Sequence, residues 1–195
     1  MTDTIHWREA VKSRDTVALR RFTCTTRREG KNAPPPHEDE VQRYFRQHAI
    51  AAANRSRDQG RGGRLVIAED AQGIAAAFTH QRVDPARFPP KLARALDITG
   101  AGEVVRELCF LAVATRYRGR GGLLANEAVT EALYDIIDCE SQAQRIHVLG
   151  QVDYHNKASM QMLERFNFSR LTQGVPPPKG DQRFGWWLHI IDPPQ

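Results

Sequence analysis

The chain has 195 residues, of which 41% are hydrophobic and 26% are charged. This is long enough to bury a core and ordinary for a globular protein, so we expect one domain. No apolar run approaches the length of a membrane span, and the start, MTDTIHWREAVKSRD, lacks the apolar segment of a signal peptide. The net charge of +5 suits an anionic partner, whether a phosphorylated cofactor, an acidic substrate or nucleic acid, without distinguishing among them.

The cysteines and histidines show no pattern of a disulfide framework or a metal site. The three cysteines, Cys24, Cys109 and Cys139, are odd in number and scattered, with no CxxC. We therefore expect reduced thiols and a cytoplasmic protein. The seven histidines have no metal-ligand spacing with cysteines or carboxylates, so we expect no structural metal.

The first half of the chain predicts two helices followed by a β-hairpin. A short helix is expected over 15–22 and a second over 39–56, where apolar residues keep helical spacing. The turn-rich segment REGKNAPPPHEDE separates them. A basic loop, RSRDQGRGGR (55–64), leads to the strands 65–69 and 74–83, which the short turn AQG joins as a hairpin.

The second half predicts alternating strands and helices after an interruption. A loop over 84–102, carrying a short helix at 90–96, is followed by an apolar strand at 104–114 and a helix at 122–138. The remaining elements are a strand at 145–152, a helix at 156–166 and strands at 169–172 and 184–190. This order predicts a mixed α/β sandwich with a parallel pair of strands around the helix 122–138.

A glycine- and arginine-rich loop, RYRGRGG (116–122), joins that apolar strand to that helix. Glycines allow close approach of the backbone, and the first N–H groups of a helix have no partner within it, so such a junction can bind an anion. The side chains of Arg116, Arg118 and Arg120 can add charge. The loop is neither a Walker A motif nor a GxGxxG dinucleotide motif. The alternative is a solvated basic turn that caps the helix.

From Glu107 to Phe168, about a third of the chain, the sequence resembles the GCN5-related N-acetyltransferase (GNAT) family. The loop matches the family's Q/R-x-x-G-x-G/A motif, which binds the pyrophosphate of acetyl-CoA, and ELCFLAV is similar to its fourth strand. The downstream motif N-x-x-[AS]-x-x-x-[YL]-x-x-x-[GN]-F is matched by the residues Asn156, Ser159, Leu163, Asn167 and Phe168.

The resemblance implies a GNAT-type fold, a mixed and mostly antiparallel sheet flanked by helices, with acetyl-CoA as co-substrate and no metal. It implies one acyltransferase domain over 1–195, with a helical acceptor-side region at 1–60, an insertion at 84–102 and an acetyl-CoA-binding core at 104–168. Counting from the helix aligns Arg116 with the first motif position, whereas counting from the strand selects Arg118. The implied cofactor-binding residues are Leu111, Ala112, Val113, Arg116, Arg118, Gly119, Arg120, Gly121, Gly122, Asn156 and Ser159.

Acetyl transfer needs a base that generates the neutral amine, and the resemblance implies that Glu107 is this base. The alternative is that Glu107 pairs with Arg106 or points to solvent. Many relatives use a tyrosine as the acid where this chain has Leu163, which cannot donate a proton. Tyr154 is a substitute acid, as is His155, although both have a simpler role in packing and helix entry. Water can also protonate the thiolate.

The acceptor is an amine that the sequence does not identify, and a protein or small-molecule amine is favoured. The N-terminal region weakly resembles the entry segment of GNAT toxins that acetylate aminoacyl-tRNA, through F-x-C and a helix containing alanine. Those toxins usually retain the tyrosine that Leu163 replaces. Because of the resemblance to these toxins and the basic net charge, tRNA is kept as an alternative partner. A homodimer is also kept as an alternative. The alternative function is a catalytically inactive acyl-CoA-binding GNAT module, for which Leu163 is the best support.

Overall fold

The computed structural model describes residues 4–25, 36–118, 122–171, 175–178 and 181–193. The chain forms two compact units. The first comprises Met1–His80 and Phe110–Ala132, and the second comprises Gln81–Cys109 and Leu133–Gln195. None of the helices in the described ranges has the length and apolarity that a membrane span requires.

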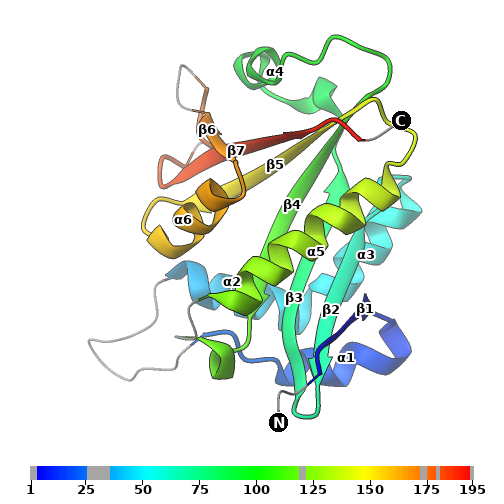
Figure 1. Cartoon of the computed structure of the whole chain (residues 1–195), viewed down its shortest axis with the longest axis vertical. Coiled ribbons are helices and arrows are strands. Elements are labelled where there is room, and N and C mark those ends of the chain that lie inside the picture. The colour runs from blue at the N-terminus through cyan, green and yellow to red at the C-terminus, as the bar shows by residue number, and fades with distance from the viewer. Residues whose placement is uncertain (1–3, 26–35, 119–121, 172–174, 179–180, 194–195) are drawn as a thin grey trace. The chain divides into compact units, whose positions relative to one another are not determined.

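Seven strands and six helices make up the described part of the chain (Figure 1). The strands are hydrogen-bonded in the order β1-β2-β3-β4-β5-β7-β6, with β4 and β5 parallel and the pairs β1–β2, β2–β3, β5–β7 and β6–β7 antiparallel. The predicted mixed α/β class is confirmed, including the parallel pair. The strands are β1 His6–Glu9, β2 Arg64–Asp70, β3 Gly73–Arg82, β4 Glu103–Val113, β5 Arg145–Asp153, β6 Ser169–Leu171 and β7 Phe184–Ile191, and the helices are α1 Lys12–Arg21, α2 Pro36–Gln47, α3 Ala49–Asp58, α4 Pro90–Leu96, α5 Leu123–Cys139 and α6 Lys157–Arg165.

The first unit is built on the hairpin of β2 and β3. Alternate residues of a strand point to opposite faces, and β2 uses both of its faces for packing. Leu65 and Ile67 pack with buried side chains of α1, α2 and α3, whereas Ala68 packs with Leu124 and Ala128 of α5. A hairpin packed on both faces fixes the position of the β4–α5 junction in this unit, where the backbone N–H of Ala114 donates to the carbonyl of Ala75 at 2.7 Å.

The second unit contains the first part of β4 together with β5, β7 and β6. Leu149 and Gly150 are neighbours in β5 and therefore point to opposite faces. On the Leu149 side, Leu92 and Leu96 of α4 complete a buried cluster. On the other side, Leu163 of α6 is the nearest side chain to Gly150. Two helices therefore cover the two faces of this part of the sheet.

Most elements match their predicted bounds, and α4 matches them at both ends. The prediction of one helix over 39–56 is wrong, because the helix is interrupted at His48, where φ is −124° and departs from helical values. The buried residues Phe45, Ala49 and Ala53 are spaced four apart and belong to the same cluster, so helical spacing continues across the break. The basic stretch 55–64 is only partly a loop, since α3 continues to Asp58. The strand β1 was not predicted.

Candidate functional site

The junction between β4 and α5, in the first unit, contains the glycine- and arginine-rich loop. After β4 ends at Val113, a short 3-10 turn covers Thr115–Tyr117, and α5 begins at Leu123. Gly122 has φ +73°, a left-handed conformation that favours glycine, and its carbonyl accepts the N–H of Asn126 at 2.9 Å. The residues 119–121 lie outside the described ranges, so the predictions for Gly119, Arg120 and Gly121 stay predictions. The first N–H groups of α5 follow directly from this loop.

Arg116 is bound to the β2–β3 turn of the same unit. Its Nη2 lies 2.7 Å from Oδ2 of Asp70, its Nε lies 3.2 Å from that oxygen, and its Nη2 also donates to the carbonyl of Gly73. The hydroxyl of Tyr117 donates to the same carboxylate oxygen at 2.6 Å. Burial raises the pKa of Asp70, but the hydrogen bonds from Tyr117 and Arg116 outweigh it and hold the pKa below its usual value. Asp70 therefore anchors the start of the loop.

Arg118 forms a second anchor in the first unit. Its Nη1 lies 3.0 Å and 3.1 Å from the two carboxylate oxygens of Glu38 in α2, and its Nη2 donates to the carbonyl of Cys24. The guanidinium groups of Arg116 and Arg118 thus each have an acidic partner. Backbone N–H groups are better suited than these two side chains to bind an anion at this junction, because the charges of both arginines are already compensated.

The end of β4 supplies the predicted residues Leu111, Ala112 and Val113. Ala112 is buried with the α1–α3 side chains, whereas Leu111 and Val113 pack on the opposite face, next to Leu124 and Ala128. The strand therefore presents its backbone between two packed faces just before the loop.

Glu107 lies in the part of β4 that belongs to the second unit, and it is half-buried. Its Oε1 accepts a hydrogen bond from Nε2 of Gln151 in β5 at 2.6 Å. Its neighbour Arg106 points to the opposite face of the strand, where Nε donates to Glu140 at 2.7 Å. Arg106 and Glu107 thus contact different side chains, Glu140 and Gln151, on opposite faces of β4. The base role of Glu107 stays a prediction. Gln151 was not predicted, although the parallel pairing of β4 and β5 brings it near Glu107.

Tyr154 follows the end of β5 in the second unit. Its ring lies under the guanidinium of Arg170, whose Cζ is 4.2 Å from the ring centroid. A Cβ at residue 185 would lie 2.5 Å from the Tyr154 hydroxyl oxygen, so Gly185 provides the space that this side chain occupies. His155 is mostly exposed, and its Nδ1 lies 2.9 Å from Asp153. Tyr154 therefore keeps a defined position next to β7.

Asn156 is the N-cap of α6, because its side-chain oxygen accepts the backbone N–H of Ser159 at 3.1 Å. This capping role does not conflict with the predicted contact to the cofactor. Leu163 is 4% exposed and lies in the interior of the second unit. An apolar side chain therefore occupies the place of the usual tyrosine, and no proton donor is available from residue 163.

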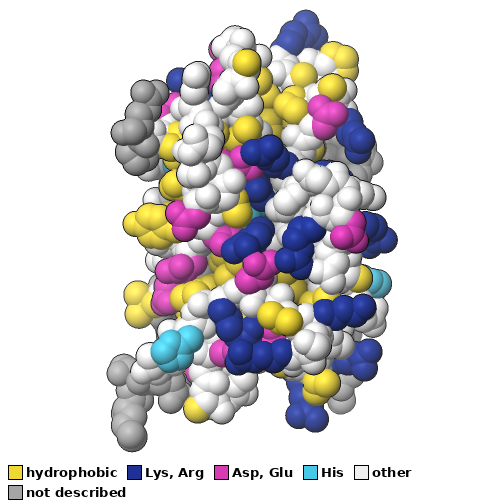
Figure 2. Space-filling view, turned by 90° about the vertical axis from the view of Figure 1, so that its right-hand side faces the viewer, with side chains coloured by type: hydrophobic (Ala, Val, Ile, Leu, Met, Phe, Trp, Pro, Cys, Tyr) yellow, Lys and Arg dark blue, Asp and Glu magenta, His cyan; other side chains and the backbone are white. Residues whose placement is uncertain are grey.

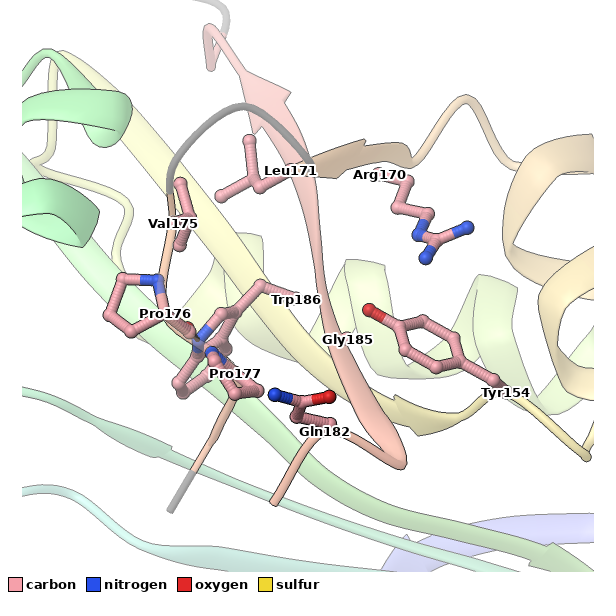
Figure 3. Close-up of a pocket in the computed structure, with 9 residues that line it drawn as sticks. All are labelled: Tyr154, Arg170, Leu171, Val175, Pro176, Pro177, Gln182, Gly185 and Trp186. Carbon is pink, nitrogen blue, oxygen red and sulfur yellow. Dashed lines mark hydrogen bonds between the residues drawn. The ribbon is translucent and has the colours of Figure 1, made fainter. Parts of the chain in front are cut away.

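A pocket of about 210 Å³ lies at the edge of β7 in the second unit. Figure 3 shows Tyr154 and Arg170 on one side of the strand and Val175, Pro176 and Trp186 on the other. The described lining residues are Tyr154, Arg170, Leu171, Val175, Pro176, Pro177, Gln182, Gly185 and Trp186. Sequence reasoning did not find this pocket, because its lining comes from four separate segments.

None of the three cysteines, Cys24, Cys109 and Cys139, forms a disulfide. Cys24 is buried, and this burial raises the pKa of its thiol to about 11. The predicted reduced state of the thiols is consistent with this environment. The Sγ of Cys109 lies 3.4 Å from the backbone carbonyl of Glu107, and this side chain is only half-buried.

Comparison with known proteins identifies the fold. No protein-family model matches the sequence, and no curated protein matches it. Among solved structures, a GNAT-family protein from Desulfovibrio desulfuricans is 16% identical, with a TM-score of 0.56 over 97% of this chain and 99% of that chain. NAA60 of Arabidopsis thaliana, in complex with a bisubstrate analogue, is 17% identical, with a TM-score of 0.57 over 96% and 97% of the two chains.

A point mutant of the AtaT toxin, bound to acetyl-CoA and to the C-terminus of the antitoxin AtaR, is also similar. It is 13% identical, with a TM-score of 0.57, over 95% of this chain and 94% of that chain. These similarities extend over nearly the whole of each chain. The protein therefore has the GNAT fold, and the resemblance seen in the sequence between 107 and 168 is confirmed at the level of the fold.

Proposed function

We propose that this protein is an N-acetyltransferase that transfers an acetyl group from acetyl-CoA to a primary amine. The observation that carries the proposal is the junction of β4 and α5, in which a glycine at φ +73° precedes a 17-residue helix, in a fold shared with GNAT acetyltransferases. The positive end of such a helix and its unpaired N–H groups suit a pyrophosphate.

Acetyl-CoA supplies the activated thioester, and the residues of this chain would hold it at two places. The loop 119–122 and the first turn of α5 would bind the pyrophosphate through backbone N–H groups. The backbone of Leu111–Val113 would lie along the acetyl and pantetheine part. Asn156 and Ser159, at the start of α6 in the second unit, stay predicted contacts of the cofactor. Arg116 and Arg118 would act through their anchoring contacts to Asp70 and Glu38, which fix the loop.

Glu107 is the proposed general base. The carboxylate is held by a hydrogen bond from Gln151, and a carboxylate in its ionised form can accept a proton from an amine directly or through an ordered water. Once the amine has lost its proton, its lone pair attacks the thioester carbonyl, a C–N bond forms, the C–S bond breaks and the thiolate leaves. Tyr154 is the proposed donor of a proton to that thiolate, and water is the alternative donor.

A protein or small-molecule amine is the favoured acceptor over tRNA. In the basic stretch 55–64, Arg57 and Arg64 bind Glu9, and Arg61 binds Gln59. Because these arginines already have partners within the protein, less of their positive charge is available to bind the phosphates of a tRNA. Figure 2 shows one face of the molecule, on which basic side chains lie among acidic and apolar ones. The cytoplasmic location and a homodimer stay predictions.

The alternative is an inactive module that binds acyl-CoA. The buried Leu163 favours it, whereas the carboxylate of Glu107, which accepts a hydrogen bond from Gln151, supports the enzyme. Thiol release from acetyl-CoA with a panel of amines separates the two. The enzyme releases thiol in an amine-dependent manner, and Glu107→Gln lowers kcat by about a hundredfold while the KM for acetyl-CoA is kept. The exposed control Glu164→Gln leaves kcat unchanged. No thiol release with any amine would favour the module.

A further inference from the structure

The three residues that follow α1, Phe22–Cys24, lie between α2 and the β4–α5 junction of the first unit. The side chains of Phe22 and Cys24 belong to the buried cluster, and each residue is 3% exposed, whereas Thr23 is exposed. The ring of Phe22 makes an edge-to-face contact with that of Phe45 in α2, with 5.7 Å between the centroids. The segment is therefore anchored in the core by two side chains, and its polar groups can bind on either side.

The α2 side of this segment is held mainly by one guanidinium group. The Nε of Arg46 donates to the carbonyl of Phe22 at 2.7 Å, and its Nη2 donates to the hydroxyl of Thr23 at 2.9 Å. The amide oxygen of Gln42 accepts the backbone N–H of Cys24 at 3.2 Å. Hydrogen bonds from a charged donor are stronger than those between neutral groups. Arg46 therefore makes the stronger of these two attachments of α2 to the segment.

The other side of the segment holds the start of the β4–α5 loop. The backbone N–H of Thr115 donates to the carbonyl of Thr23 at 2.9 Å, and Nη2 of Arg118 donates to the carbonyl of Cys24. Thr115 begins the 3-10 turn of the loop, and Arg118 directly follows that turn. Thr23 and Cys24 thus each contact α2 through one group and the loop through another.

Arg46 and Thr115 are joined through a single residue, Thr23. Without the bonds from Arg46, the carbonyl of Thr23 can shift, and the N–H of Thr115 loses a fixed acceptor. The attachment of Arg116 to Asp70 comes from the β2–β3 turn and does not pass through this segment. Removal of Arg46 should therefore loosen the start of the loop without abolishing its structure.

We propose that Arg46 is a positioning residue for acetyl-CoA binding and that it acts through Phe22–Cys24 on the β4–α5 loop. The proposal rests on the proposed function, in which this loop and the first turn of α5 bind the pyrophosphate. Backbone N–H groups bind an anion more tightly when they are already held in the bound geometry, because ordering a loop on binding costs conformational entropy. A loop that Arg46 holds through the segment therefore binds acetyl-CoA more tightly than a loose one.

Calorimetric titration of the full-length protein with acetyl-CoA tests the role of Arg46. Arg46→Met removes the charge and the donors but keeps an unbranched side chain, whereas Arg46→Lys keeps a charge and donors. Arg43→Met is the matched control, because Arg43 is an exposed arginine one turn earlier in α2. All titrations are made at a temperature at which circular dichroism shows each variant to be folded.

Arg46→Met should weaken acetyl-CoA binding by about tenfold, the scale of a hydrogen bond from a charged group. Arg46→Lys should bind more tightly than Arg46→Met, and Arg43→Met should bind as the wild type does. An equal Kd for the wild type and Arg46→Met, equal losses in Arg46→Lys and Arg46→Met, or a loss of the same size in Arg43→Met would overturn the proposal.

A second pair of variants tests the path through Thr23. Thr115→Pro removes the N–H that donates to Thr23, and the extended backbone of Ala114 (φ −57°, ψ 144°) is compatible with a proline after it. Thr115→Val is the control, because it keeps this N–H. Thr115→Pro should weaken acetyl-CoA binding, and adding Arg46→Met should cause little further loss, since both changes act on one contact. Fully additive losses would overturn the path.

Hydrogen exchange of the Thr115 amide, measured without acetyl-CoA, separates failure of this proposal from failure of the proposed function. If the wild type binds no acyl-CoA, the proposed function fails. Faster exchange in Arg46→Met but not in Arg43→Met then still supports the attachment of the loop through Arg46, and unchanged exchange overturns it. If the wild type binds acetyl-CoA and exchange is the same in Arg46→Met, the function stands and the path through Thr115 is overturned.

Discussion

The ion pairs of Glu140 are expected to make a large contribution to stability. In the second unit, the side chain of Glu140 is 1% exposed and that of Arg106 is 4% exposed, whereas that of Arg82 is 51% exposed. The Nε atoms of both arginines lie 2.7 Å from Oε1 of Glu140. Replacing Glu140 with Gln removes the negative charge that pairs with the buried Arg106, and breaking a buried pair costs about 3–5 kcal/mol.

The lower end of this range, about 3 kcal/mol, is expected for Glu140→Gln, because Gln keeps an acceptor oxygen and Arg82 can be hydrated. In a chain of this size each kcal/mol lowers the Tm by about 2–4 °C, so the Tm should fall by roughly 6–12 °C. Arg82→Gln should cost only about 1 kcal/mol, since its side chain is half exposed. Urea unfolding at pH 7, followed by circular dichroism, measures the change in unfolding free energy of both variants.

The pH dependence gives an independent check. Burial raises the pKa of Glu140, but the hydrogen bonds from Arg82 and Arg106 outweigh it and hold the pKa below its usual value. Its contribution is therefore present above the unfolded pKa, about 4.3, and is lost as the pH falls through the lower folded pKa. The difference between wild type and Glu140→Gln should shrink in acid. An unchanged urea midpoint at pH 7, or a difference that does not shrink in acid, would refute the reasoning.

Two further predictions concern residues that hold the start of the loop and the start of α6. Asp70→Asn removes the negative charge that binds Arg116 and Tyr117, so the loop should lose an anchor. Calorimetry should then show several-fold weaker binding of acetyl-CoA. An unchanged Kd would show that this anchor does not contribute to binding. Asn156→Ala removes the N-cap of α6 and should lower the free energy of unfolding in urea by about 1 kcal/mol. Asn156→Ser keeps a capping oxygen and should retain most of that free energy. Equal stability of the wild type and both variants would contradict the capping role.

Local signals predicted most of the fold. The hairpin of β2 and β3, the helix α4 and the strand β4 each have an apolar pattern or turn residues that act within a few positions. The strand β1 was not predictable in this way, because it has only four residues and depends on its pairing with β2. The interruption at His48 was missed because buried residues keep helical spacing on both sides of it.

Contacts between residues distant in the sequence limited what could be predicted of the site. Arg116 and Arg118 were visible as charges, but their partners Asp70 and Glu38 are 46 and 80 residues away. Gln151 is an ordinary polar residue of a strand until the register of β4 and β5 brings it to Glu107. The pocket at the edge of β7 likewise depends on tertiary structure. Motif spacing therefore indicated the loop and the proposed base, but not the residues that contact them.

The central claim is that the loop and the first turn of α5 bind acetyl-CoA, and calorimetric titration with acetyl-CoA tests it most directly. The wild type should bind one equivalent per chain. Gly121→Glu, which adds bulk and negative charge at the proposed pyrophosphate position, should abolish binding, whereas Ser141→Glu, which adds the same charge at an exposed turn, should keep it. No binding of acetyl-CoA or any other acyl-CoA by the wild type, or undiminished binding by Gly121→Glu, would contradict the claim.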